Sequence, residues 1–156
     1  NKLTGTIPLE LTAMTTLTSL FLYDNVLTGG IPSELAALTK LITLGLNNNK
    51  LSGGIPSDLA AIKTLKFVSL YNNRLSGSIP VELVTMTTLQ RLDLQNNQLS
   101  GSIPPEVIQA TQLTAMYLYN NQGLCGVVPA SLLALLATQN FYREGTSGTS
   151  LGNQTI

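Results

Sequence analysis

Carboxylate side chains recur every 24 residues and are the first candidates for chemistry in this chain. Each one stands two residues after a proline that suits the first turn of a short helix. A carboxylate at that place is stabilised by the helix dipole. We therefore expect these side chains to stabilise helices and not to act as general acids or bases. The column consists of Glu10, Glu34, Asp58, Glu82 and Glu106.

The remaining residue types argue against catalysis. The chain has no histidine, and its single cysteine, Cys125, has no basic residue within fifteen positions to activate the thiol. The sequence contains no metal-ligand cluster, no phosphate-binding glycine loop and no nucleophile beside a base. We predict a protein that is not an enzyme and that uses no metal and no cofactor.

Charge and composition narrow the class of partner. Eight basic and eight acidic residues cancel, so nothing predicts binding to nucleic acid or to an anionic membrane. The longest apolar run, 132–137, is far shorter than the roughly 20 residues that span a bilayer, so no membrane span is predicted. Aromatic residues make up 5% of the chain and tryptophan is absent, so the interior must be aliphatic.

The chain repeats itself with a period of 24 residues, which indicates stacked units that share a core only with their neighbours. We expect one array over 1–137, with a partial repeat at 1–16 and a last unit that acts as a C-terminal cap. Because the chain begins within a repeat, we expect it to be a fragment whose first strand lies upstream. The Gly-, Ser- and Thr-rich segment 138–156 is expected to be a flexible tail. The units begin at Leu17, Leu41, Leu65, Leu89 and Leu113.

Alternation within each unit predicts a short strand, and successive strands then pair in a parallel sheet. An asparagine follows each strand, and a buried amide is costly unless its polar groups are paired. We expect these asparagines to form a ladder that bonds the backbone of the turn leaving the strand. The ladder consists of Asn25, Asn49, Asn73, Asn97 and Asn121.

A glycine and an Ile-Pro pair complete each unit, as in Leu75 to Pro80, and the glycine suits a backbone position barred to other residues. The whole pattern, LxxLxLxxNxLxGxIPxxLxxL, resembles the plant-type leucine-rich repeat of receptor-like kinases, receptor-like proteins and polygalacturonase inhibitors. This resemblance implies an α/β repeat solenoid that is right-handed and curved. Its parallel sheet would lie on the concave face, with short helices or 3-10 turns on the convex face. It also implies a second short strand near each Leu-Ser/Thr-Gly segment, and an extracellular or cell-surface location.

The C-terminal end departs from the family pattern. Family members usually close the array with two cysteines, whereas no second cysteine follows Cys125. The residue is therefore either a small buried hydrophobe or the partner of a cysteine outside this chain. Leucines over 132–136 are expected to form the helix that caps the core. Asn153 begins a possible N-glycosylation sequon, Asn-Gln-Thr.

Aromatic residues gather at the strand positions that the pattern turns toward solvent. Six of the eight aromatics of the chain occupy these positions, with Arg91 and Asp93 between them. High strand propensity explains the rings in one interpretation, and a binding surface explains them in the other. Arg91 and Asp93 either pair with each other or supply the polar part of a recognition site. The candidate ligand-binding residues are Phe21, Tyr23, Phe67, Tyr71, Arg91, Asp93, Tyr117 and Tyr119.

Three functions follow from these patterns. The main hypothesis is a protein- or peptide-recognition module, with a glycan as a further possible ligand, taken from an extracellular receptor or a secreted inhibitor. A structural subunit of a larger complex is the alternative. Ice binding through the regular hydroxyl column is a minor alternative. The hydroxyl column consists of Thr4, Thr28, Ser52, Ser76 and Ser100.

The area of the sheet limits what this face can bind. Five strands at about 4.8 Å spacing offer a face on the order of 400 Å², whereas a standard interface takes about 800 Å² per partner.

Overall fold

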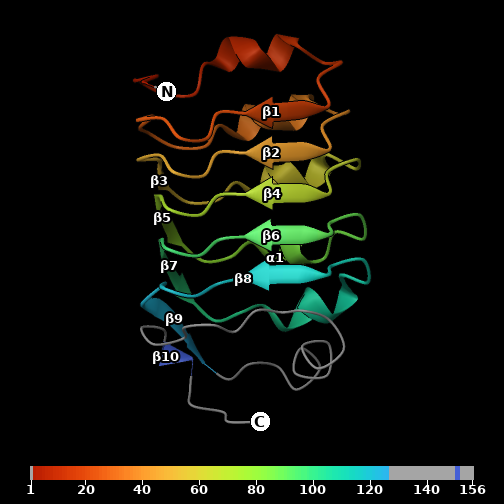
Figure 1. Cartoon of the computed structure of the whole chain (residues 1–156). Helices are drawn as coiled ribbons and strands as arrows, with labels where there is room; N and C mark the ends of the chain where they lie inside the picture. The colour runs from red at the N-terminus through yellow and green to blue at the C-terminus, as the bar shows by residue number, and fades with distance from the viewer. Residues whose placement is uncertain (1, 127–149, 152–156) are drawn as a thin grey trace.

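The units stack as a solenoid, as expected (Figure 1). The computed structural model describes residues 2–126 and 150–151. Each full unit contributes one strand to a parallel sheet with the order β1-β2-β4-β6-β8. The register places Leu20, Leu44, Val68, Leu92 and Met116 side by side across the sheet. The strands are β1 (Ser19–Phe21), β2 (Thr43–Gly45), β4 (Phe67–Ser69), β6 (Arg91–Asp93) and β8 (Ala115–Tyr117).

A second parallel sheet runs along the side of the stack with the order β10-β9-β7-β5-β3. It forms where the resemblance implied a second strand. Its close spacing at one point depends on Gly123, because a Cβ there would lie 2.8 Å from the carbonyl oxygen of Leu99. The strands are β3 (Ser52–Gly53), β5 (Arg74–Gly77), β7 (Gln98–Gly101), β9 (Gly123–Gly126) and β10 (Ser150–Leu151).

Short helices line the convex side opposite the first sheet. In the part of the chain that the structure describes, four are 3-10 helices and one is a single α-helical turn. Each helix begins directly after its proline, which is the N-cap residue and has extended backbone. The sequence suggests that this proline belongs to the first helical turn, but it lies one residue before that turn. The acidic residue of each unit lies in the first turn. The helices are η1 (Leu9–Ala13), η2 (Ser33–Ala37), η3 (Ser57–Ala61), α1 (Val81–Val84) and η4 (Pro105–Gln109).

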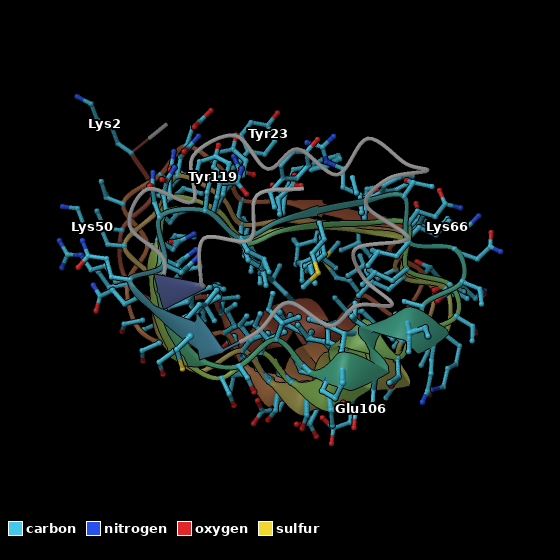
Figure 2. The ribbon with its side chains drawn as sticks, turned by 90° about the horizontal axis from the view of Figure 1, so that it is seen from below. Lys2, Tyr23, Lys50, Lys66, Glu106 and Tyr119 are labelled. Carbon is cyan, nitrogen blue, oxygen red and sulfur yellow. The ribbon has the colours of Figure 1, made fainter. Side chains whose placement is uncertain are left out.

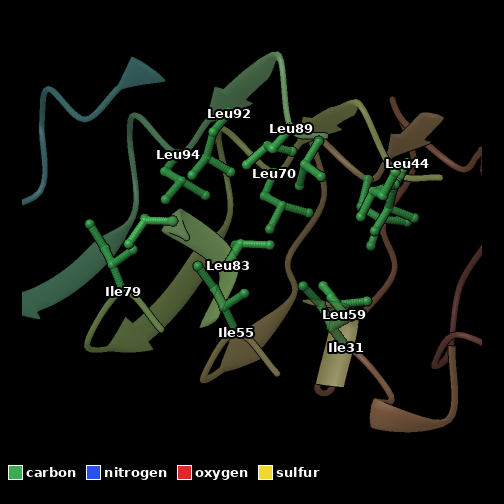
Figure 3. Close-up of a cluster of buried hydrophobic side chains, with 14 of the residues drawn as sticks. Ile31, Leu44, Ile55, Leu59, Leu70, Ile79, Leu83, Leu89, Leu92 and Leu94 are labelled. Carbon is green, nitrogen blue, oxygen red and sulfur yellow. The ribbon is translucent and has the colours of Figure 1, made fainter. Parts of the chain in front are cut away.

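The core between the sheets and the helices is aliphatic. Leu41, Leu65, Leu89 and Leu113 are fully buried, and each one begins a unit. Figure 3 shows Leu92 and Leu94 facing Leu83 of α1 across this core. Because each unit buries its leucines against the next unit, the interior runs without interruption along the stack. The right-handed leucine-rich solenoid predicted from the sequence is confirmed.

The C-terminal predictions meet the structure only in part. The proposed cap helix over 132–136 and Asn153 lie outside the described residues, as does most of the predicted tail, 138–156. Two residues of that tail are described and form β10, which pairs with β9. Cys125 lies in β9 with an exposed side chain and no disulfide, so its interpretation as a buried hydrophobe is wrong. Within the described residues, no helix is long and apolar enough to cross a membrane.

Candidate functional site

The concave face is the outer surface of the first sheet and of the residues that directly follow its strands. Seen along the stack in Figure 2, Tyr23 and Tyr119 project from this side, while Glu106 projects from the opposite side. Phe21, Tyr23 and Phe67 are 58%, 45% and 39% exposed. The remaining candidate rings, those of Tyr71, Tyr117 and Tyr119, are half-buried. The face therefore has an open apolar end and a more enclosed polar end.

A glycine shapes the apolar end. The rings of Phe21 and Tyr23 meet edge to face, with centroids 5.9 Å apart and planes at 69°. Both rings lie against Gly45 of the next strand, where a Cβ would come within 3.0 Å of Phe21 and 3.5 Å of Tyr23. Although Gly45 occupies a strand position that the pattern turns to solvent, these rings bury it. The two rings thus pack directly against the backbone of Gly45, where no side chain intervenes.

An ion pair organises the polar end. Arg91 Nε donates to both carboxylate oxygens of Asp93, at 2.9 and 3.0 Å, so the two residues pair along one strand. The guanidinium carbon also lies 4.9 Å from the ring centroid of Tyr117, in a cation–π contact. The Arg91 side chain is half exposed, whereas Asp93 is buried. Two of the candidate residues therefore hold Arg91 in place while part of it stays open to solvent.

Burial and pairing act on the charges of this ion pair in opposite directions. Burial raises the pKa of the Asp93 carboxyl, and the hydrogen bond and charge of Arg91 only partly offset that rise. For Arg91, burial lowers the pKa, but the hydrogen bond and charge of Asp93, together with the nearby Tyr117 and Tyr71, raise it and the net shift is upward. Arg91 therefore stays charged, while burial destabilises the ionised form of the Asp93 carboxyl.

Besides Gly45, three further positions that the pattern assigns to solvent are buried. Asp93, Gln95 and Asn47 are 4%, 8% and 8% exposed. Their expected solvent exposure is wrong. For Asp93 the reason is the longer side chain of Arg91, whose guanidinium bonds to both carboxylate oxygens. Among the described residues, Gln95 Oε1 alone is a buried side-chain polar atom without a hydrogen-bond partner. The periodicity of the sequence does not predict that this oxygen is buried and unpaired.

The asparagine ladder bonds the backbone on both sides of each unit boundary. Asn97 Oδ1 accepts from the backbone N–H of Leu75 at 3.0 Å. Its Nδ2 donates to the carbonyl oxygens of Leu70 and Leu94, each at 3.1 Å, and of Gln95 at 3.4 Å. Asn25, Asn49, Asn73 and Asn121 repeat the interaction with the preceding unit. This column holds successive units together.

A second amide ladder, which the sequence analysis missed, borders the concave face. Its members precede the first ladder by one residue and all have positive φ, between 54° and 57°. Asn48 donates to Asp24 at 2.5 Å, and each later amide donates to the unit before it at 2.5 or 2.6 Å. The available signal was an Asn or Asp at every such position, because these residues tolerate left-handed backbone. The ladder consists of Asp24, Asn48, Asn72, Asn96 and Asn120.

The convex side carries a groove. A groove of about 570 Å³ lies between η3 and α1, lined by residues that include Asp58, Lys63, Glu82 and Met86. Among residues 2–126 and 150–151, no three acidic, cysteine or histidine side chains are placed to hold a metal ion. The concave face therefore remains the best-defined candidate site.

Comparison with known proteins agrees with this geometry. The family model described as Leucine Rich Repeat matches 16–38, 40–62, 64–86 and 88–109, more than half of the chain. A search of curated proteins found no match.

Solved structures of plant receptors are similar to the chain. The plant peptide hormone receptor RGFR1, solved with RGF2, is 41% identical with a TM-score of 0.82; the match covers 85% of this chain and 21% of that one. The Arabidopsis receptor kinase HAESA, solved with the peptide hormone IDA and the co-receptor SERK1, is 38% identical with a TM-score of 0.82, over 86% of this chain and 22% of that one. The BIR2 ectodomain from Arabidopsis thaliana is 32% identical with a TM-score of 0.77, over 86% and 69%. The chain thus spans about a fifth of the first two.

Proposed function

Since the chain belongs to the leucine-rich-repeat family, in its plant-type class, we propose that it is a non-catalytic module that binds a peptide or protein segment on its concave face. We assign the contacts to Phe21, Tyr23 and Phe67 at the apolar end. Arg91 and the half-buried tyrosines supply the polar end. The location that fits this role is extracellular or at the cell surface, in a receptor ectodomain or a secreted inhibitor.

The observation that carries the proposal is the placement of the aromatic side chains. The core of the described residues is aliphatic, yet three large rings stand 39–58% exposed on one face. Exposed Tyr and Phe offer rigid contact area at little entropic cost, which is why such residues dominate binding energy at interfaces. The neighbours RGFR1 and HAESA were solved with peptide hormones, which supports a peptide as the ligand.

A display experiment tests the proposal. A phage-displayed random dodecapeptide library is selected on the immobilised chain, and the selected peptides are measured against the double variant Phe21→Ala/Phe67→Ala. We expect affinity to fall by about tenfold or more, because the variant removes most of the open apolar area.

The control removes the same kind of side chain from the other side of the molecule. Leu9 and Ile108 are 51% and 53% exposed and lie in the convex helices η1 and η4. Peptides should bind Leu9→Ala/Ile108→Ala as they bind the unmodified chain. Selection of no peptide, or equal binding to both double variants, would contradict a concave binding site.

A further inference from the structure

Gln95 carries a polar group that the fold buries and does not use. Its side chain is 8% exposed, and Oε1 lacks any hydrogen-bond partner among the described residues. Leaving a buried carbonyl oxygen unpaired costs free energy, so such atoms are rare in folded proteins. Asn97, two residues later and equally exposed at 8%, has both its oxygen and its nitrogen bonded to backbone. The unpaired group is therefore specific to Gln95 and not a general property of buried amides here.

The position of Gln95 points to a ligand. Backbone hydrogen bonds from Asn72 to Gln95 and from Asn96 to Tyr119 continue the sheet register past the strands. Gln95 therefore lies in one row with Tyr71 on the preceding unit and Tyr119 on the following unit. Asp93, two residues before Gln95, is already paired with Arg91. The unpaired amide thus stands among half-buried rings, next to a charge pair whose two charges cancel.

One end of the amide reaches the surface. Nε2 is not among the buried unpaired atoms, and it donates no hydrogen bond to the described residues, so it is the end that a partner can contact. Rotation about the last side-chain bond is soft and exchanges the places of Oε1 and Nε2. A ligand group that both donates and accepts hydrogen bonds can therefore pair with whichever end of the amide faces the surface. A peptide group has this combination of N–H and C=O.

We propose that Gln95 is a specificity-determining residue that pairs with an uncharged peptide group of the ligand, which rests on the proposed function of the concave face. Binding then gives the outward end of the amide a hydrogen bond that the fold does not supply. Because the neighbouring charges cancel, this part of the ligand is neutral. The apolar side chains of the same ligand lie toward Phe67 and Phe21.

The first arm of the test needs no ligand. Gln95→Met removes both polar atoms at similar volume, and Asn97→Leu does the same for the satisfied amide. We expect the Tm of Gln95→Met to equal or exceed that of the unmodified chain, since no native bond is lost. Asn97→Leu should lower Tm by about 5 °C or more. If Gln95→Met lowers Tm as much as Asn97→Leu, Gln95 has a structural role and the proposal is overturned.

The second arm uses dodecapeptides selected on the unmodified chain whose binding depends on Phe21 and Phe67. Their affinity should fall about tenfold or more with Gln95→Met, while the control Leu9→Ala/Ile108→Ala leaves it unchanged. If such peptides bind Gln95→Met undiminished, the role of Gln95 is overturned while the proposed function stands. If no selected peptide depends on Phe21 and Phe67, the proposed function fails, and this inference with it. Binding of an oligosaccharide panel instead, lost with Gln95→Met, would overturn the peptide assignment.

Discussion

Asn97 and Gln95 are two amides of one unit with the same exposure, 8%, but different surroundings. Asn97 bonds backbone groups of its own turn and of the preceding unit. Gln95 leaves Oε1 unpaired. Burial alone therefore does not separate the scaffold of this protein from its proposed recognition surface. The separation depends on whether the buried polar groups find partners inside the fold.

The same contrast extends to whole columns. Residues that recur in every unit, such as the ladder asparagines, meet the same backbone groups each time. Residues that change from unit to unit, such as Gly45, Phe67 and Arg91, face neighbours that also change. The repeated columns hold the units together, and the variable columns are free to differ in chemistry. Four experiments test how far this division holds.

The largest effect is expected where a satisfied amide loses its donor. Asn97→Asp keeps the acceptor for the Leu75 N–H but places a carboxylate against the carbonyl oxygens of Leu70 and Leu94. We expect the free energy of unfolding to fall by about 3 kcal/mol or more near neutral pH. Protonation restores one donor, so the loss should shrink as the pH falls. Urea denaturation at several pH values measures it, and a pH-independent loss would contradict this account of the ladder.

A matched pair of glycines compares a repeated column with a variable one. Gly77 has φ +77° with no atom within 4 Å of an added Cβ, so Gly77→Ala meets only backbone strain. We expect it to lower the free energy of unfolding by about 1–2 kcal/mol. Gly45→Ala is different, because the neighbouring Phe21 ring is 58% exposed and can move aside. It should be neutral or stabilising by up to about 0.5 kcal/mol. Thermal unfolding of both variants gives the comparison, and equal losses would remove the distinction.

The second ladder, which includes Asn72, tests how much a side-chain hydrogen bond stabilises the fold when it is exposed to solvent. Asn72 donates to Asn48 and accepts from Asn96, and its φ is +54°. Asn72→Gly removes both bonds but suits the left-handed backbone, so we expect a loss of only about 0.5 kcal/mol. Asn72→Ala should lose about 1 kcal/mol more, because alanine resists that conformation. If Asn72→Gly is as harmful as Asn97→Asp in urea denaturation, solvent does not weaken these bonds as expected.

The smallest effect concerns Asp93 and pH. Its carboxyl pKa is raised above the ordinary 3.8 by burial, so the folded chain binds the proton more tightly than the unfolded chain does. The resulting contribution to stability is present at low pH and is lost as pH rises through the raised pKa. Asp93→Asn cannot titrate, so the unmodified chain should lose stability relative to it as the pH rises from the ordinary carboxyl pKa through the raised one. Chemical denaturation across this range measures the difference. A relative gain would mean that the pairing with Arg91 outweighs burial.

The sequence alone determined the architecture because each scaffold column repeats its environment. Leucine spacing, the ladder asparagines, the turn glycines and the prolines each indicated a local structure. Because every unit repeats the same pattern, each indication was supported several times along the chain. The same periodicity placed Phe21, Tyr23 and Phe67 on the outer surface of the sheet. No single residue was needed for these predictions.

Only the tertiary structure decided which outward-facing residues stay exposed. Register brings Gly45 under two aromatic rings and Arg91 over Tyr117, and these neighbours come from different units. The burial of Asp93 and the unpaired oxygen of Gln95 depend on the sizes of such neighbours. A periodic pattern specifies the direction in which a side chain points. Its exposure and its partners depend on packing between units, where the sequence does not repeat.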